Sequence, residues 1–195
     1  MRTFGLTAVA ALALAACDSN DAGNNLSTDT NLGADGAVLG ANEATDNEAA
    51  VAMPTDANGF ATAVAASDLY EIESGRLAQQ KGSSADVKSM AEHLVTDHQK
   101  STADLKAAAA KASPAVTVAP ALDAEKQAML DELKAASGAD FDRKFLDQQT
   151  TAHQKALALL RNYASGGDSQ PLKDFASKAA TAVDGHLEHL NSIKK

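Results

Sequence analysis

The sequence predicts an all-α fold, an up-and-down four-helix bundle with an additional short helix in its central connection. Three observations support this prediction. Of the 195 residues, 45% are hydrophobic but only 4% are aromatic, and the apolar content is mostly alanine and leucine, which favour helices. Helix start and stop signals recur along residues 58–195. No strand-like alternation of apolar and polar residues interrupts them.

The first two long helices have recognisable ends. The first is expected to begin at Asn58 as its N-cap and to end near Gly82. Ser83 is expected to cap the second, with Asp86 three residues later in a capping-box arrangement. A helix cannot readily continue through a proline, so the second should end before Pro114.

The remaining helices follow a connection that contains proline and valine. A shorter helix is expected over residues 121–136 and a long one over residues 140–165. Asp140 and Asp142 suit the N-terminus of that long helix, where acidic groups are favourable. The last helix has Pro171 in its first turn, where a missing N–H is harmless. Residues 58–195 are therefore expected to form one helical domain.

The beginning of the chain resembles a bacterial lipoprotein signal peptide over residues 1–16. One positive charge precedes an uncharged run over residues 4–16, which is too short to span a bilayer. The sequence LAAC at its end resembles a lipobox, in which Cys17 receives diacylglycerol. An ordinary secretory signal with a chance cysteine is the alternative. We expect a lipid-anchored protein of the cell envelope that faces the periplasm. The sequence leaves open whether the inner or the outer membrane holds it.

Residues 17–57 are expected to be the lipidated cysteine and a disordered acidic tether. Residues 18–57 hold eight acidic side chains and no Lys or Arg, and they offer too little apolar surface to offset the entropy of ordering. The net charge of −9 is concentrated there, since residues 58–195 hold 18 acidic and 16 basic side chains. No basic stripe exists to neutralise phosphates, so the sequence excludes nucleic acid as a partner. The protein partner and oligomeric state are left open.

Helix phase predicts a polar cluster in the core. At about 100° per residue, one ionisable side chain lies on the apparent core stripe of each long helix. These residues are close to the middle of their helices, and in an antiparallel bundle helix midpoints share a level. His93, by contrast, points about 140° away from His98 and is expected to be exposed. The four side chains expected to meet are Glu71, His98, His153 and His186.

Several longer motifs resemble those of the bacterial domain-of-unknown-function family 4142, ferritin-like helical proteins often labelled putative outer membrane proteins. The motifs are YEIESGRLAQQK, DVKSMAEHLVTDHQKS, SGADFDRKFLDQQTTAHQKAL and GHLEHL, and the resemblance covers residues 58–193. Two positions differ from the family pattern, where Thr181 replaces a proline and Leu94 replaces a methionine. The resemblance implies recurrent polar positions at Glu71, Glu73, Asp97, His98, Asp142, His153 and His186.

The cluster predicts a metal site of one carboxylate and three imidazoles. Glu71, His98, His153 and His186 would suit iron, manganese, zinc or copper. Asp97, Asp142 or Gln149 could orient an imidazole by a hydrogen bond. The Glu-x-x-His motif of di-iron carboxylate proteins is absent, so we do not expect a ferroxidase or an iron store.

Other interpretations stay open. A buried hydrogen-bonded network could simply fix helix register, which would suit a non-enzymatic binding or scaffolding module. A cavity in the alanine-rich core, away from the histidines, would suit a small-molecule carrier. No catalytic residue is predicted, because no Gly-x-Ser-x-Gly elbow is present and Cys17, the one cysteine, is assigned to lipid. The favoured function is metal handling or stress tolerance in the envelope, with no established enzymatic activity.

Overall fold

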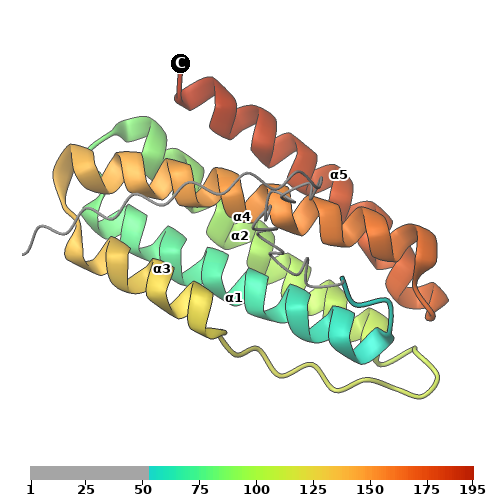
Figure 1. Ribbon diagram of the computed structural model, residues 1–195. Coiled ribbons are helices and arrows are strands. Elements are labelled where there is room, and N and C mark those ends of the chain that lie inside the picture. Colours follow the sequence, from blue (N-terminus) through green and yellow to red (C-terminus); the bar gives the residue numbers. More distant parts are fainter. Residues whose placement is uncertain (1–52) are drawn as a thin grey trace, which may run out of the picture. The chain divides into compact units, whose positions relative to one another are not determined.

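The computed structural model describes residues 53–195, which form five helices (Figure 1). Residues 1–52, with the predicted signal peptide, Cys17 and most of the tether, lie outside the described residues. None of the described helices is long and apolar enough to cross a membrane. The helices are α1 (Ala57–Lys81), α2 (Ala85–Ala109), α3 (Ala124–Ala135), α4 (Gly138–Gly166) and α5 (Gln170–Ile193).

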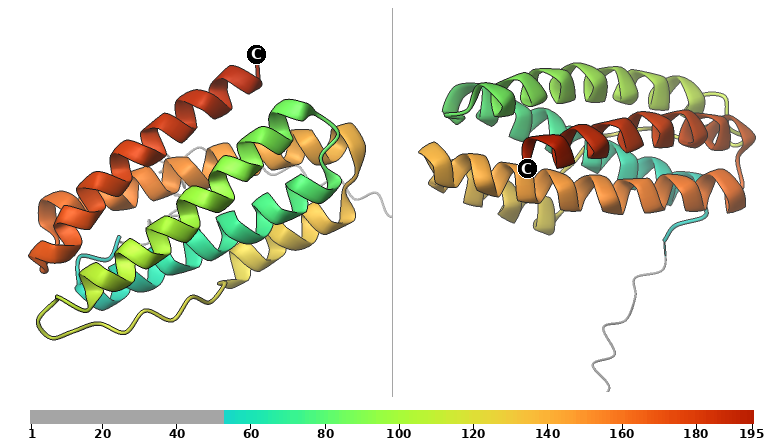
Figure 2. Two further views of the ribbon diagram at one scale, coloured as in Figure 1. Left: turned by 180° about the vertical axis from the view of Figure 1, so that it is seen from behind. Right: turned by 90° about the horizontal axis from the view of Figure 1, so that it is seen from above.

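Four long helices form the bundle, and α3 is the short helix of the central connection (Figures 1 and 2). Around the bundle α1 packs on α2, α2 on α5, α5 on α4 and α4 on α1, while α3 packs on α1 and α4. The predicted all-α bundle is thereby confirmed. Each long helix is antiparallel to its two neighbours in this ring. Helices α2 and α4 run in the same direction, because the connection containing α3 returns the chain along the bundle.

Two helices have N-cap residues other than those predicted. The side chain of Asp56, and not that of Asn58, caps α1 by accepting a 2.8 Å hydrogen bond from the backbone N–H of Gly59. The Ser84 side chain, and not that of Ser83, caps α2 by accepting from the N–H groups of residues 86 and 87. In both cases the cap residue has an extended backbone, as N-caps require.

Asp142 holds the turn between α1 and α2, and this corrects its predicted role at the start of α4. Its carboxylate accepts hydrogen bonds from the backbone N–H of Ser83 at 2.9 Å and of Ser84 at 2.8 Å, and from the Ser83 hydroxyl. Burial opposes ionisation, but these hydrogen bonds outweigh it and lower the pKa of Asp142. The residue ties α4 to the N-terminus of α2 and lies outside the histidine cluster.

Two apolar clusters fill the ends of the bundle. The first surrounds a stack of Phe60 on Tyr163, with ring centroids 3.8 Å apart, and Phe175 packs edge-on against it. The second, at the end where α1 turns into α2, contains Phe141 and Phe145. Two of the eight buried polar side chains, Asp142 and Ser169, are at helix ends. The other six lie between the two clusters, and they are Asp68, Glu71, Ser74, His98, Gln149 and His153.

Candidate metal centre

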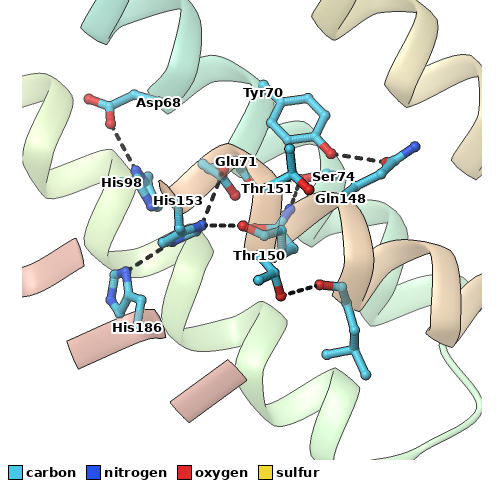
Figure 3. Close-up of polar contacts among 12 residues, drawn as sticks. Asp68, Tyr70, Glu71, Ser74, His98, Gln148, Thr150, Thr151, His153 and His186 are labelled. Carbon is cyan, nitrogen blue, oxygen red and sulfur yellow. Dashed lines mark hydrogen bonds and ion pairs between the residues drawn. The ribbon is translucent and has the colours of Figure 1, made fainter. Parts of the chain in front are cut away.

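Three imidazoles converge at the middle level of the bundle (Figure 3). His98 comes from α2, His153 from α4 and His186 from α5, and one nitrogen from each lies within 4.8 Å of the other two. The ring centroids are 5.3 Å apart for His153 and His186, 5.6 Å for His98 and His153, and 5.7 Å for His98 and His186. The three helices therefore contribute a nearly equilateral set of nitrogen donors.

These spacings fit one shared metal ion. An ion about 2.0–2.1 Å from one nitrogen of each ring would place the ring centres roughly 5.1–5.5 Å apart, for angles between tetrahedral and trigonal. The observed distances exceed that range by at most a few tenths of an ångström. His153 Nε2 and His186 Nδ1 are already 3.3 Å apart. Small side-chain rotations would complete the coordination.

The other nitrogen of each ring has a hydrogen-bond partner. Nδ1 of His98 lies 2.8 Å from Oδ1 of Asp68, and Nε2 of His186 lies 2.9 Å from Oδ2 of Asp97. Nδ1 of His153 lies 2.9 Å from the backbone oxygen of Gln149. Such partners fix the tautomer and orientation of metal-binding histidines. Nε2 of His98 is buried and has no hydrogen-bond partner among the described residues.

Glu71 takes a different place from its three predicted companions. Its Oε1 lies 3.6 Å from Nδ1 of His153, whereas Nε2 of that ring faces His186. The carboxylate thus contacts Nδ1 of His153 and not Nε2, the nitrogen that faces His186, and it lies outside the convergent set of donors (Figure 3). The structure brings together three of the four predicted ligands and places the fourth behind one of them.

The three residues predicted to orient imidazoles take different places in the structure. Asp97 does contact His186. Gln149 acts on His153 through its backbone oxygen, while its side chain donates to the Ser74 hydroxyl at 2.9 Å. Asp142 lies instead at the α1–α2 turn and contacts no imidazole, because its oxygens are occupied by Ser83 and its neighbour.

Sequence reasoning missed Asp68, which is only 3% exposed and pairs with His98. It lies on α1 one turn before Glu71. Helix α1 is apolar on several sides, so its inward face could not be identified by phase alone. The available signal was the i, i+3 spacing of two carboxylates in a helix otherwise rich in alanine.

Burial and neighbouring charges set different protonation states across the cluster. Burial lowers the pKa of His153 to about 3, and the charges of His98 and His186 act in the same direction. Burial also lowers the pKa of His186, against the opposing effect of Asp97. For His98 burial is outweighed by Asp68 and Glu71, which raise its pKa. Burial raises the pKa of Glu71 to about 7. His153 and His186 are thus neutral near pH 7, the form that binds metals.

A groove of about 830 Å³ leads from the surface to His98 and His186. Its walls are largely apolar, and its rim includes Lys100, Lys111 and Lys178. The groove reaches the histidines, which distinguishes it from the cavity away from the histidines that a small-molecule carrier was expected to have. The side chain of His186 is 13% exposed, so solvent and small solutes can reach the cluster. Residues lining the groove walls include Val64, Ala108, Leu159, Leu160, Phe175 and Val183.

Comparison with known proteins identifies both a family and a set of similar folds. The sequence model of a family described as "Domain of unknown function (DUF4142)" matches residues 42–193. No curated protein matches the chain.

The solved structures that resemble this one include three forms of CopM. Cu(II)-bound CopM has a TM-score of 0.59 at 17% identity, covering 70% of this chain and 94% of CopM. Silver-bound CopM has a TM-score of 0.58 at 18% identity, covering 70% and 93%. Apo CopM has a TM-score of 0.57 at 18% identity, covering 70% and 94%. At such identity the likeness establishes the helical-bundle fold.

Proposed function

The chain belongs to the DUF4142 family, whose description assigns no function, and on that premise we propose that it binds one transition-metal ion through His98, His153 and His186. The observation that carries the proposal is the convergence of three imidazoles from three helices, each oriented by a partner on its remote nitrogen. In a network that served only to fix helix register, each buried polar atom would have a hydrogen-bond partner within the network. Here Nε2 of His98 is buried at the point of convergence and has no hydrogen-bond partner within residues 53–195.

The donor set defines the class of ion. Three imidazoles without a thiolate suit zinc, copper, iron or nickel, and the absence of a coordinating carboxylate makes manganese less favourable. CopM, which shares the fold, has been solved with Cu(I), Cu(II) and silver bound. Copper is therefore the first ion to test.

Three protein ligands leave at least one coordination position for water or another ligand. The groove that ends at His98 and His186 provides access to that position. Asp68 and Asp97 would hold two of the imidazoles in the required orientation, and Glu71 would supply negative charge behind His153. A reachable, incompletely coordinated ion suits uptake and release, which supports metal handling as the function.

The proposed setting is the cell envelope. A signal peptide followed by Cys17 in a lipobox-like sequence supports a lipid anchor, with the bundle facing the periplasm. Mass spectrometry of the N-terminal peptide should find acyl chains on Cys17, and the Cys17→Ala protein should lose its membrane association. An unmodified N-terminus in the membrane fraction would contradict the anchor. Separation of the two membranes would then locate the protein.

The metal proposal is tested on the full chain, purified without a polyhistidine tag or chelator and dialysed to remove weakly held ions. Elemental analysis and titration with copper, zinc, iron and manganese should find one tightly held ion per chain. His98→Gln and His153→Gln should each lose it while circular dichroism shows a folded bundle.

Tyr70→Phe is the matched control for the buried layer. It removes a hydroxyl that donates to Gln148 at 3.0 Å without touching an imidazole, so it should keep the ion. A parent protein that takes up none of the four ions would overturn the proposal. The histidines would then be assigned to a structural network in a binding or scaffolding module.

A further inference from the structure

The remaining two of the five histidines in the chain face each other across the seam between α2 and α5. His93 and His189 are both exposed, and their ring centroids are 6.1 Å apart at an interplanar angle of 43°. Helices α2 and α5 pack against each other in the bundle. Helix phase predicted an exposed His93, which is confirmed, but it gave no indication of an imidazole partner from another helix.

We propose that His93 and His189 form a second, solvent-exposed metal site that takes up the ion and passes it to the buried centre. The transfer step rests on the proposed function of that centre, whereas the surface site stands on its own geometry. Its ligand is the same class of imidazole-binding transition-metal ion.

The spacing of the pair fits two-imidazole coordination. With metal–nitrogen distances of about 2.0–2.1 Å, two rings on one ion have centres roughly 5–6.5 Å apart, depending on the angle at the metal. The observed 6.1 Å lies within that range. The rings come from different helices, so their relative position is set by the packing of α2 on α5. Two ligands with water in the remaining positions would hold an ion more weakly than three buried imidazoles.

Donor groups lie along both helices between this pair and the buried centre. Asp97 follows His93 by one helical turn on α2, and His186 precedes His189 by three residues on α5. The Asp97 carboxylate is half exposed and lies 2.9 Å from Nε2 of His186. His186 in turn lies 3.3 Å from His153. In the proposed transfer the ion exchanges one of these ligands for the next on its way to the buried centre.

The surface site is tested in the full chain that lacks the buried one. We expect the His98→Gln/His153→Gln protein, which keeps only one buried imidazole, to bind one Cu(II) at pH 7, with an electron paramagnetic resonance spectrum showing nitrogen ligation. Adding His93→Gln and His189→Gln should abolish that binding. Glu92→Gln, an exposed change next to His93, is the matched control and should leave it intact. Equal Cu(II) binding with and without the pair would overturn the surface site.

The transfer step is tested by the rate of loading. Stopped-flow measurement with a copper–glycine complex should show that His93→Gln/His189→Gln loads the buried centre several-fold more slowly than the parent, with the same final occupancy. The Glu92→Gln protein should load at the parental rate. An unchanged rate in the double variant would overturn transfer. A parent that binds copper at the surface pair but never at the buried centre would overturn the proposed function and transfer while retaining the surface site.

Discussion

Asp142 and His98 are both buried polar residues, yet their hydrogen-bonding groups are used differently. Asp142 places both carboxylate oxygens on donors from the α1–α2 turn. His98 pairs one nitrogen with Asp68 and leaves the other buried without a partner, beside two further imidazoles. A buried polar group that serves structure is satisfied within the fold. A His98 nitrogen without a partner among the described residues, beside two imidazoles from other helices, instead indicates a place for something the chain does not supply.

The same contrast separates the ends of the bundle from its middle. Both end clusters are apolar and contain stacked aromatic rings. The level between them holds the imidazoles and carboxylates. Stability and binding should therefore respond to different substitutions, and four changes test that separation.

The largest effect on stability is expected from Phe145→Ala, in the second apolar cluster. Phe145 is fully buried and packs near Phe141, and deleting a buried phenyl ring costs about 3–5 kcal/mol of unfolding free energy. Urea denaturation measures this loss. The folded variant should still bind the same number of metal ions per chain. If it also lost metal binding, stability at the end cluster and binding at the middle level would not be independent.

Asp142→Asn should lower the unfolding free energy by about 1.5–3 kcal/mol at pH 7, because it weakens charge-assisted hydrogen bonds. The pKa of Asp142 in the fold lies below its ordinary 3.8. Its contribution is therefore complete above that value and lost as the pH falls through the lowered pKa. The difference in stability between parent and variant should therefore narrow as the pH falls, as urea denaturation at pH 7 and in acid would show. A difference that does not narrow would contradict this assignment.

A smaller effect, confined to binding, is expected from Asp68→Asn. The amide is close in shape to the carboxylate but weakens the interaction that orients His98. Losing such a partner typically lowers metal affinity about 10–100-fold. Competition with a chelator of known affinity measures the change, and His98→Gln provides the comparison of complete loss. Unaltered affinity would assign Asp68 to structure alone.

The smallest effect is expected from Arg161→Ala. Its guanidinium pairs with Asp184 at 2.8 Å between α4 and α5, with both side chains more than half exposed. Exposed pairs of this kind contribute about 0–1 kcal/mol. Thermal unfolding and copper titration should both be close to those of the parent. A large loss of either would show that the surface of α4 and α5 supports the buried centre.

Much of the centre could be predicted from helix phase. Helices α4 and α5 are strongly amphipathic, so the inward positions of His153 and His186 follow from the sequence. The role of Glu71 and the inward position of Asp68 could not be predicted from helix phase, because α1 is apolar on several sides. Phase also cannot tell which ring nitrogen faces a neighbour, since side-chain rotation decides that.

The fold class and helix count were likewise predictable, while the details at helix ends were not. Asp142 holds the turn before a helix distant in sequence, and local capping rules consider only adjacent residues. The common direction of α2 and α4 depends on how the connection containing α3 returns along the bundle. Both features are decided by tertiary packing.

The three imidazoles stand on α2, α4 and α5, and this order has a consequence for synthesis. A chain that has emerged only as far as α4, whether from the ribosome or during export, offers only His98 and His153 of the set. Three-imidazole coordination must wait until α5 has docked, so ion capture at this centre follows the completion of the bundle and cannot guide its earliest steps. A chain with an ion bound at this centre would then be one whose final helix has been made and has docked.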